Sequence, residues 1–245
     1  MILAAGLGTR LRPLTDNRPK ALVEVGGRTM LEIALARLRS FGVREVIINA
    51  HHFADMIIGY LEANNNFGMR IEVSREEVLL DTGGGLKKAA SFFLEDSASL
   101  EVPFILHNVD VVSTIDLHRM AQFHAENHAV ATLAVQDRET SRYLLFDEQL
   151  HLCGRRSGDS QEKELVRCSQ PAHALAFCGI HIISPRLFAL MTEENAFSII
   201  NCYLRLAALG EKIVAFRADD YYWRDMGRPE NLLLAAHDVR EKVFP

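Results

Sequence analysis

The segment ILAAGLGTRLRP, residues 2–13, places a short apolar run directly before a glycine-rich, basic loop. The run Ile2–Ala5 is long enough for a buried strand, and Gly6 and Gly8 end it. Glycines let a backbone approach an anion closely and present its N–H groups to phosphate oxygens. In open α/β sheets, ligands bind beyond the carboxyl ends of the strands. The segment therefore predicts the first strand of an α/β sheet, followed by a phosphate-binding loop.

Strand-like and helix-like periods alternate along the rest of the first half. Strands are expected at about 43–50, 69–74, 102–107 and 129–135, and helices near 29–41, 54–61, 83–93 and 113–125. Thr29 and Glu32 match a capping box, Gly42 is placed to end that helix, and Ser113 and Asp116 are expected to cap the last one. The βαβα order predicts a doubly wound, mostly parallel, Rossmann-like mixed sheet with helices on both faces, in three layers.

The second half of the chain is less regular. A hairpin is expected at 142–147 and 150–153, an exposed polar loop or flap at 154–171, and a strand at 174–183. A helix is expected at 197–209, ended by Gly210.

Composition bounds the class of protein. The chain has 245 residues, 49% hydrophobic and 24% charged, which excludes disordered, collagen-like and disulfide-scaffold proteins. A net charge of −5 argues against a nucleic-acid partner, and no apolar run approaches the roughly 18 residues of a membrane helix. Four irregularly spaced cysteines predict reduced thiols, and hence a cytoplasmic protein. We expect one domain over 1–245, as a monomer or a homodimer.

Basic residues cluster around the glycine loop, in an otherwise acidic chain. Two familiar phosphate-binding motifs fail here, because Leu11 stands at the third glycine of the dinucleotide fingerprint and no Walker lysine follows. The basic residues are Arg10, Arg12, Arg18 and Lys20, opposed only by Asp16. This excess of positive charge predicts a phosphate-rich small molecule as ligand, whereas the glycines alone would equally suit a tight turn.

Two aspartates stand in positions that suit a metal site. Asp110 directly follows the expected strand at 102–107, and Asp225 lies in the segment Trp223–Gly227. Taken alone, either residue is more often a cap or a turn residue. If the two carboxylates converge, they predict a Mg²⁺ site, because Mg²⁺ prefers hard oxygen ligands and keeps waters and substrate phosphates as the others. Zinc finds no support, since His124 and Glu126 have no matching cysteine motif.

The string from Leu3 to Lys20, LAAGLGTRLRPLTDNRPK, resembles the signature of the sugar-phosphate nucleotidyltransferases, also called nucleotide-sugar pyrophosphorylases. The resemblance implies a Mg²⁺-dependent (or Mn²⁺-dependent) transferase that joins a nucleoside triphosphate and a sugar 1-phosphate, for a cell-wall or glycan precursor. It implies a nucleotide-binding part at about 1–135, a sugar-phosphate-binding part at about 136–228 and a C-terminal helix at about 229–243.

The resemblance also implies roles for individual residues. It implies that Arg10 and Lys20 are catalytic and that Asp110 and Asp225 hold the metal. The implied nucleotide-binding residues are Ala4, Ala5, Gly6, Gly8, Thr9, Arg10, His51, Thr82, Gly83 and Gly84, and the implied substrate-binding residues are Asn108, Arg142 and Gly179.

The resemblance leaves the substrates open. The chain looks most like N-acetylmuramate 1-phosphate uridylyltransferases, so UTP is favoured. Mannose-1-phosphate guanylyltransferases are the runner-up, phosphocholine cytidylyltransferases a more distant one, and a catalytically silent homologue that binds nucleotide sugars is the alternative of another class. Val109 departs from the usual Asn-Gly-Asp pattern, which puts the fit of the nucleotide in question but not the metal ligand.

Overall fold

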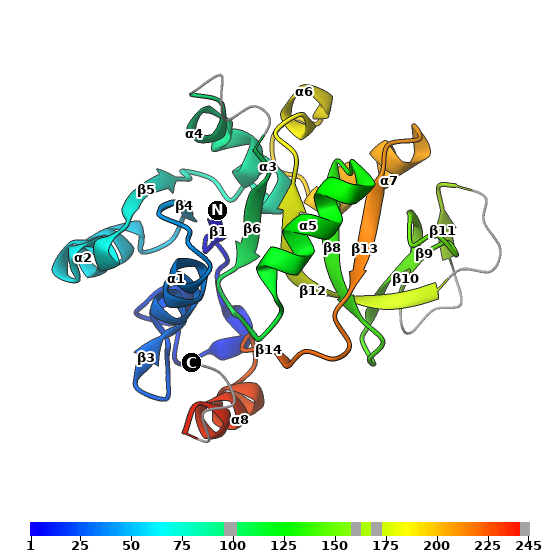
Figure 1. The fold of residues 1–245 in the computed structure, drawn as a ribbon. Coiled ribbons are helices and arrows are strands. Elements are labelled where there is room, and N and C mark those ends of the chain that lie inside the picture. Colours follow the sequence, from blue (N-terminus) through cyan, green and yellow to red (C-terminus); the bar gives the residue numbers. More distant parts are fainter. Residues whose placement is uncertain (96–101, 158–162, 168–172, 241–245) are drawn as a thin grey trace. The chain divides into compact units, whose positions relative to one another are not determined.

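The structure is a computed structural model that describes residues 1–95, 102–157, 163–167 and 173–240. The chain divides into two units, both drawn in Figure 1. Unit 1 comprises Met1–Asp81, His107–Ile115 and Tyr221–Pro245, and unit 2 comprises Thr82–Leu106 and Asp116–Asp220. The expected single domain with three functional parts stays a prediction.

Unit 1 contains a parallel sheet built on the first strand of the chain. Its strands follow the order β6-β1-β4-β5, with β1 (Ile2–Leu3), β4 (Glu45–Ala50), β5 (Arg70–Arg75) and the end of β6 (Phe104–Asn108). All of the β6-β1, β1-β4 and β4-β5 pairs are parallel. Ile2 and Ile48 are fully buried opposite each other, as expected of strands in a parallel sheet.

The first helix, α1 (Met30–Ser40), begins and ends where the sequence predicts. The Thr29 hydroxyl accepts a hydrogen bond from the Glu32 backbone N–H at 3.1 Å, and Gly42 adopts φ 82° after the last turn. The remaining short elements of this part are α2 (Ala54–Ala63), the 3₁₀ turns η1 (Thr9–Leu11), η2 (Lys20–Leu22) and η3 (Asn65–Gly68), and the hairpin β2 (Glu24–Val25) and β3 (Arg28–Thr29).

One two-stranded ladder of unit 1 has no counterpart in the sequence-based expectations. Here β7 (Val111–Ser113) pairs antiparallel with β14 (Trp223–Asp225), which precedes α8 (Pro229–Arg240). The predicted start of a helix at Ser113 is therefore wrong, because Ser113 belongs to β7. The helix α5 (Leu117–Asn127) begins after Asp116, whose carboxylate accepts hydrogen bonds from two backbone amides of the first turn. Positions 241–243 of the predicted C-terminal helix lie outside the described residues.

Unit 2 contains a mixed sheet. Its strands are β8 (Ala131–Gln136), β9 (Arg142–Phe146), β10 (Leu152–Ser157), β11 (Lys163–Leu165), β12 (His173–Ile183) and β13 (Ile213–Arg217), together with β6. They follow the order β11-β10-β9-β12-β6, and β8 pairs with β12 and with β13. The predicted hairpin is confirmed as β9 and β10. The predicted polar loop at 154–171 is wrong where the structure describes it, because β10 extends to Ser157 and pairs with β11. Positions 158–162 and 168–171 of that loop lie outside the described residues.

The helices of unit 2 either precede β6 or lie between later strands in the sequence. They are α3 (Asp81–Lys88, which starts at the last residue of unit 1), α4 (Ala90–Leu94), α5, α6 (Leu187–Leu190) and α7 (Ile199–Ala208). The helix α7 begins after its cap residue Ser198, two residues later than predicted, and is followed by Gly210 at φ 89°, as predicted. The predicted fold class, a mixed α/β sheet with helices, is confirmed. Among the described residues, no helix is long and apolar enough to cross a membrane.

Candidate active site

The glycine loop leaves the buried strand β1 at the surface of unit 1. Ala4 and Ala5 are buried, and the loop from Gly6 to Arg10 is largely exposed. Gly8 adopts φ 65°, and its carbonyl accepts hydrogen bonds from the Leu11 amide at 2.8 Å and the Thr15 hydroxyl at 2.9 Å. A Cβ atom at Gly8 would lie 2.9 Å from the Thr15 Cγ2 atom. Glycine is therefore required at this position both by its backbone angle and by the space available.

Lys20 reaches from the start of η2 to the turn after β6. Its Nζ atom donates to the Asp110 Oδ2 atom and forms an ion pair with it. The two side chains are only 12% and 15% exposed. The structure thus brings together two of the predicted site residues that are 90 positions apart in the chain.

Asp225 is held beside Asp110 by backbone hydrogen bonds of the β7–β14 ladder. The Met226 amide donates to the Asp110 carbonyl at 2.7 Å, and Asp225 stands opposite Val111 in the ladder. The Asp225 Oδ1 atom accepts from the Gly227 amide at 2.7 Å, and Asn231 of α8 donates to the Asp225 carbonyl at 2.7 Å. These contacts fix both the backbone and the carboxylate of Asp225.

Gly227 marks the point where the charged groups of the site converge. A Cβ atom at this position would lie 2.8 Å from the Asp225 Oδ1 atom, 2.9 Å from the Arg10 Nη2 atom and 3.0 Å from the Lys20 Nζ atom. No such atom can be accommodated without displacing one of these groups. The predicted residues Arg10, Lys20 and Asp225 therefore share one small volume, with Asp110 bound to Lys20.

The two carboxylates differ in their pKa shifts. Burial raises the pKa of Asp110, but the charge and hydrogen bond of Lys20 outweigh it, so that this pKa is lower than usual. The pKa of Asp225 is raised, first by burial and then by the negative charge of Asp110. A carboxylate whose pKa is raised by a second carboxylate beside it forms, together with that neighbour, a donor set that suits a hard divalent cation. The described residues offer no third His, Cys, Asp or Glu to such a cation, which fits Mg²⁺ with water and phosphate as its remaining ligands.

Three further predicted or questioned residues lie in unit 1. Asn108 is half-buried at the end of β6. The Val109 side chain is 3% exposed, and its amide donates to the Leu3 carbonyl at 3.1 Å, so the valine is packed at the end of the strand. The His51 ring, just after β4, forms a hydrogen bond through Nδ1 with the Glu76 carbonyl at 2.8 Å. Their contacts with substrates stay predictions.

The segment Thr82–Gly84 belongs to unit 2, where its polar groups have partners. The Thr82 hydroxyl accepts a hydrogen bond from the Ile199 amide at 3.0 Å. The Gly83 and Gly84 amides both donate to the Phe197 carbonyl, at 2.8 and 3.3 Å. A Cβ atom at Gly83 would lie 2.3 Å from the Phe197 ring. These glycines thus permit close packing within unit 2, and their predicted contact with a nucleobase remains a prediction.

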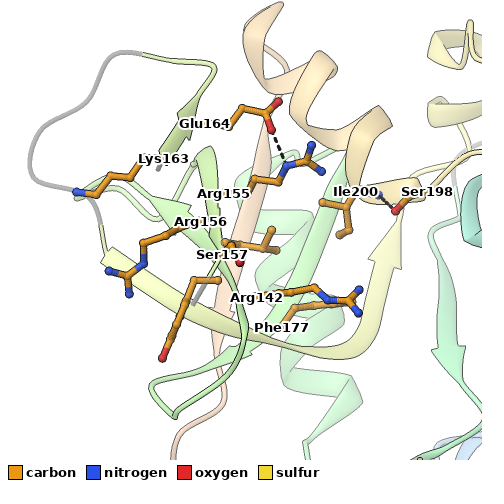
Figure 2. Close-up of a pocket in the computed structure, with 11 residues that line it drawn as sticks. Arg142, Arg155, Arg156, Ser157, Lys163, Glu164, Phe177, Ser198 and Ile200 are labelled. Atoms are coloured by element: carbon orange, nitrogen blue, oxygen red, sulfur yellow. Dashed lines mark hydrogen bonds and ion pairs between the residues drawn. The ribbon is translucent and has the colours of Figure 1, made fainter. Parts of the chain in front are cut away.

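Unit 2 also contains a cavity of about 830 Å³, shown in Figure 2. This volume lies within the range of about 300–1,000 Å³ that small-molecule sites occupy. Residues of β9, β10, β11 and β12 and the start of α7 line it; these include Arg142, Leu144, Arg155, Arg156, Ser157, Lys163, Glu164, Phe177 and Ser198. The cavity therefore combines basic, hydroxyl and apolar groups.

The strand register separates the four cations of this cavity into two sets. Side chains alternate between faces along a strand, and Arg155 stands opposite Leu144 whereas Arg156 stands opposite Tyr143. Lys163 stands opposite Arg156 and shares its face, and Figure 2 shows both pointing away from Arg142.

Arg155 has partners on its face of the sheet. It is bound to the Glu164 carboxylate at 2.6 Å and to the Asn201 Oδ1 atom at 2.7 Å. Within the described part of the chain, the Arg142 guanidinium has no hydrogen-bond or ion-pair partner. Arg142 is thus the cation on this face that is available to an anion.

Gly179 adopts φ 72° at the register shift of β12, between Phe177 and His181. The geometry is that of a strand bulge, and Gly179 is not among the residues that line the cavity. Its predicted contact with a sugar stays a prediction.

The sequence patterns gave no role in these sites to three residues that shape them. They are Gly227, Phe197 and Glu76. Gly227 ends the segment Trp223–Gly227, so its place two residues after the expected metal ligand Asp225 is the sequence feature that could have identified it. Nothing in the local sequence marks Phe197 or Glu76, because their contacts are with residues distant in the chain.

Comparison with known proteins gives concordant findings. The family model described as "Nucleotidyl transferase" matches residues 1–242. N-acetylmuramate alpha-1-phosphate uridylyltransferase of Caulobacter vibrioides is 34% identical, over 98% of this chain and 96% of that protein. Mannose-1-phosphate guanyltransferase of Yarrowia lipolytica is 30% identical over 95% of this chain, which spans only 61% of that protein. The crystal structure of HddC from Yersinia pseudotuberculosis has the same fold, with a TM-score of 0.75 and 23% identity over 97% of both chains.

Proposed function

The chain belongs to the nucleotidyl transferase family, and on that premise we propose that this sugar-1-phosphate nucleotidyltransferase uses UTP and N-acetylmuramate 1-phosphate. One observation carries the chemistry: Arg10, Lys20 and Asp225 converge around Gly227, with Asp110 bound to Lys20. The choice of substrates is supported by the similarity to the Caulobacter vibrioides uridylyltransferase, which extends over nearly the whole of both chains.

The reaction needs little covalent help from the protein. A phosphate monoester has a second pKa near 6, so a sugar 1-phosphate is mostly a dianion at neutral pH and is already a nucleophile. Its oxygen attacks the α-phosphorus of the nucleoside triphosphate, a new P–O bond forms, and pyrophosphate leaves with the electrons of the broken bond. Positioning and charge stabilisation dominate such transfers. Arg10 and Lys20 supply positive charge to the phosphates, and no general base is required.

The carboxylates of Asp110 and Asp225 would hold Mg²⁺ or Mn²⁺ in this proposal. The bound cation would neutralise phosphate charge beside the two carboxylates. The raised pKa of Asp225 supports this assignment, because a cation would relieve the repulsion between the two carboxylates. Ala4, Ala5, Gly6, Gly8 and Thr9 are proposed to contact the phosphates of the nucleotide, and His51, Thr82, Gly83 and Gly84 to line its remaining part.

We assign the cavity of unit 2 to the sugar 1-phosphate. Its size suits a monosaccharide. Among the described residues the Arg142 guanidinium has no partner, and it lines the cavity together with the apolar Phe177 ring. N-acetylmuramate carries a carboxylate in addition to its phosphate, and a guanidinium binds carboxylate or phosphate in two parallel hydrogen bonds. Asn108 and Gly179 stay proposed sugar-phosphate contacts from the resemblance alone, since neither residue lines this cavity. The cytoplasmic location and the monomeric or homodimeric state also stay proposals.

The second candidate is a mannose-1-phosphate guanylyltransferase, which the 30% identity to the Yarrowia lipolytica protein supports. A catalytically silent homologue is disfavoured, because Arg10, Lys20, Asp110 and Asp225 are all present and Lys20 and Asp110 are already paired.

A substrate panel tests the proposal. UTP and GTP are each combined with N-acetylmuramate 1-phosphate, mannose 1-phosphate and glucose 1-phosphate, with Mg²⁺, and pyrophosphate release is measured. We expect the highest kcat/KM for UTP with N-acetylmuramate 1-phosphate. Preference for GTP with mannose 1-phosphate would establish the second candidate, and no turnover with any pair would refute the activity.

Two arginine variants test the sugar assignment. Arg142→Gln should raise the KM of the sugar 1-phosphate at least ten-fold and that of the nucleotide much less, since removal of one charge-assisted contact costs about 1.5–3 kcal/mol. Arg119→Gln is the control, because Arg119 is an exposed residue of α5 in unit 2 and does not line the cavity. Equal effects of both substitutions would contradict the assignment.

A further inference from the structure

A buried chain of hydrogen bonds joins the start of the glycine loop to the segment before α3. The Ala4 amide donates to the Asn49 Oδ1 atom at 2.7 Å, and the Asn49 Nδ2 atom donates to the Glu76 Oε1 atom at 2.7 Å. The Leu80 amide donates to the Glu76 Oε2 atom at 3.0 Å. Asn49 and Glu76 are only 2% and 4% exposed. All four residues lie in unit 1.

The direction of each hydrogen bond in this chain is fixed by chemistry. The amides of Ala4 and Leu80 can only donate, so each requires an acceptor. The Asn49 oxygen must therefore face Ala4, which turns the Asn49 NH₂ group towards Glu76. Glu76 thus receives donors on both of its oxygens, from Asn49 and from Leu80. Only a carboxylate offers two acceptors here, because a glutamine would place its NH₂ group against one of these donors.

The charge on Glu76 has a cost that its contacts must offset. Within the described residues, no Lys, Arg or His forms an ion pair with it. A buried carboxylate without a cation is unfavourable, and its negative charge also lies near a loop that we assign to phosphates. A neutral side chain would avoid both penalties. The two donors facing Glu76 are the feature that only a carboxylate satisfies.

Glu76 also contacts the segment that follows β4. The Glu76 amide donates to the Ala50 carbonyl at 2.8 Å, and the Glu76 carbonyl bonds to the His51 ring at 2.8 Å. One residue therefore touches three segments of unit 1: the residue that starts the glycine loop (through Asn49), the His51 segment, and the turn at Leu80. Each of these segments contains or directly precedes a residue assigned to the nucleotide.

We propose that Glu76 is a positioning residue for the nucleotide, which holds Ala4, His51 and Leu80 in their relative places through its carboxylate, its carbonyl and Asn49. This inference rests on the proposed function in assigning a nucleotide to unit 1. The hydrogen-bond chain itself does not depend on that assignment.

Three variants test the role of the carboxylate. Glu76→Gln sets a donor against a donor, and Asn49→Asp sets a carboxylate against the Glu76 carboxylate. The double variant Asn49→Asp with Glu76→Gln restores every match. Its introduced carboxylate accepts from the Ala4 amide and from the introduced NH₂ group, and the oxygen of the introduced amide accepts from Leu80. The double variant also keeps one amide and one carboxylate, so the charge is unchanged. Glu72→Gln is the control, because Glu72 is a half-exposed residue of β5, the strand that ends just before Glu76.

Amide hydrogen exchange measures positioning without reference to activity. In Glu76→Gln one of the two donors faces the introduced NH₂ group, so we expect about ten-fold faster exchange at the Leu80 amide, or at the Ala4 amide if Asn49 turns its oxygen towards the glutamine, the effect of losing one hydrogen bond of this kind. Amides of β8, in unit 2, should keep their wild-type rates, and the double variant should restore protection at Ala4 and Leu80. Unchanged exchange at both amides in Glu76→Gln, or a double variant no better than the single ones, overturns the proposal.

Steady-state kinetics measure the consequence for the substrate. Well below the melting temperature, Glu76→Gln should raise the KM for UTP with Mg²⁺ about ten-fold, leave the KM for the sugar 1-phosphate within two-fold, and be rescued by the second substitution. Equal increases of both KM values would indicate a general loss of structure and overturn the proposal. A wild-type protein with no turnover would refute the proposed function instead, and the exchange rates would still decide whether Glu76 positions these segments.

Discussion

At the scale of single residues, Asp110 and Asp225 are chemically identical but electrostatically unequal. Burial acts to raise the pKa of both, and Lys20 overcomes it only at Asp110. Asp225 keeps a raised pKa because Asp110 adds its negative charge to the effect of burial. Lys20 therefore stabilises two carboxylates. Removing the lysine should lower the stability of the protein by a different amount than removing one of the carboxylates.

Lys20→Ala should destabilise the protein more than Asp110→Asn. The first change leaves two buried carboxylates side by side, and removing one partner of a buried pair costs about 3 kcal/mol. The second change leaves Lys20 with Asp225 as a partner, so we expect a cost of about 1 kcal/mol. Urea unfolding without added divalent cation measures both. A Lys20→Ala protein as stable as Asp110→Asn would contradict this account of the site.

Both substitutions should also reduce turnover at least about 100-fold, as removal of one charge-stabilising group from an active site commonly does. Pyrophosphate release at saturating Mg²⁺ measures this loss, and circular dichroism checks that each variant remains folded. Full activity in either variant would refute the role assigned to that residue.

At the scale of secondary-structure elements, glycines in two helices have opposite consequences. Gly83, in α3, faces Phe197 so closely that an added Cβ atom would lie 2.3 Å from the ring and 2.9 Å from the carbonyl oxygen. Gly59, in α2, is exposed and has open space where its Cβ atom would be. The first glycine is required by packing, whereas the second only adds conformational entropy to the unfolded chain.

Gly83→Ala should therefore lower the free energy of unfolding by about 1–3 kcal/mol, the usual cost of overpacking. Gly59→Ala should raise it by about 0.5–1 kcal/mol, because alanine favours an exposed helix interior over glycine. Urea titrations of the two variants beside the wild type provide the measurement. If both substitutions changed stability in the same direction, the close contact between Gly83 and Phe197 would be wrong.

The elements that the sequence did not predict are those with weak local signals. The strands β7 and β14 have three residues each and form only by pairing across about 110 positions of sequence. The predicted helix start at Ser113 failed for the same reason, because pairing with Trp223 holds Ser113 in a strand. In contrast, α1 begins and ends at its predicted cap residues, since capping depends on neighbours within one turn.

At the scale of the whole molecule, stability should depend on pH through a buried histidine in each unit. Burial lowers the pKa of His107, in unit 1, to about 4, and also that of His124, in unit 2, to about 4. The unfolded chain binds these protons at its ordinary histidine pKa, near 6.5. Below about pH 6.5 the unfolded state therefore takes up protons that the folded state excludes, so stability is complete above that pH and is lost as the pH falls towards 4.

For His107 alone, proton uptake by the unfolded state lowers the free energy of unfolding by about 2 kcal/mol between pH 7 and pH 5. In the wild type, the Asn108 carbonyl accepts a hydrogen bond from the His107 ring. In His107→Asn, the asparagine NH₂ group can replace this donor, but the side chain cannot take up a proton. The loss of unfolding free energy from pH 7 to pH 5 should be about 2 kcal/mol smaller in this variant than in the wild type. His118→Asn, at an exposed position of α5, should follow the wild type; identical pH profiles for all three proteins would contradict the buried neutral histidine.

The sequence by itself determined the features that depend on neighbouring residues. The apolar run, glycine loop and basic residues of 2–20, the caps of α1 and the mixed α/β class all follow from local spacing and composition. The tertiary structure decided the features that depend on contacts between distant segments. It pairs Lys20 with Asp110 and places Asp225 opposite Val111 of β7. It also packs Phe197 against Gly83 and sets two hydrogen-bond donors, from Asn49 and Leu80, against the buried Glu76 carboxylate. The physical reason is that local patterns set which backbone shapes are favourable, whereas a site is formed by charges and donors whose partners lie far along the chain.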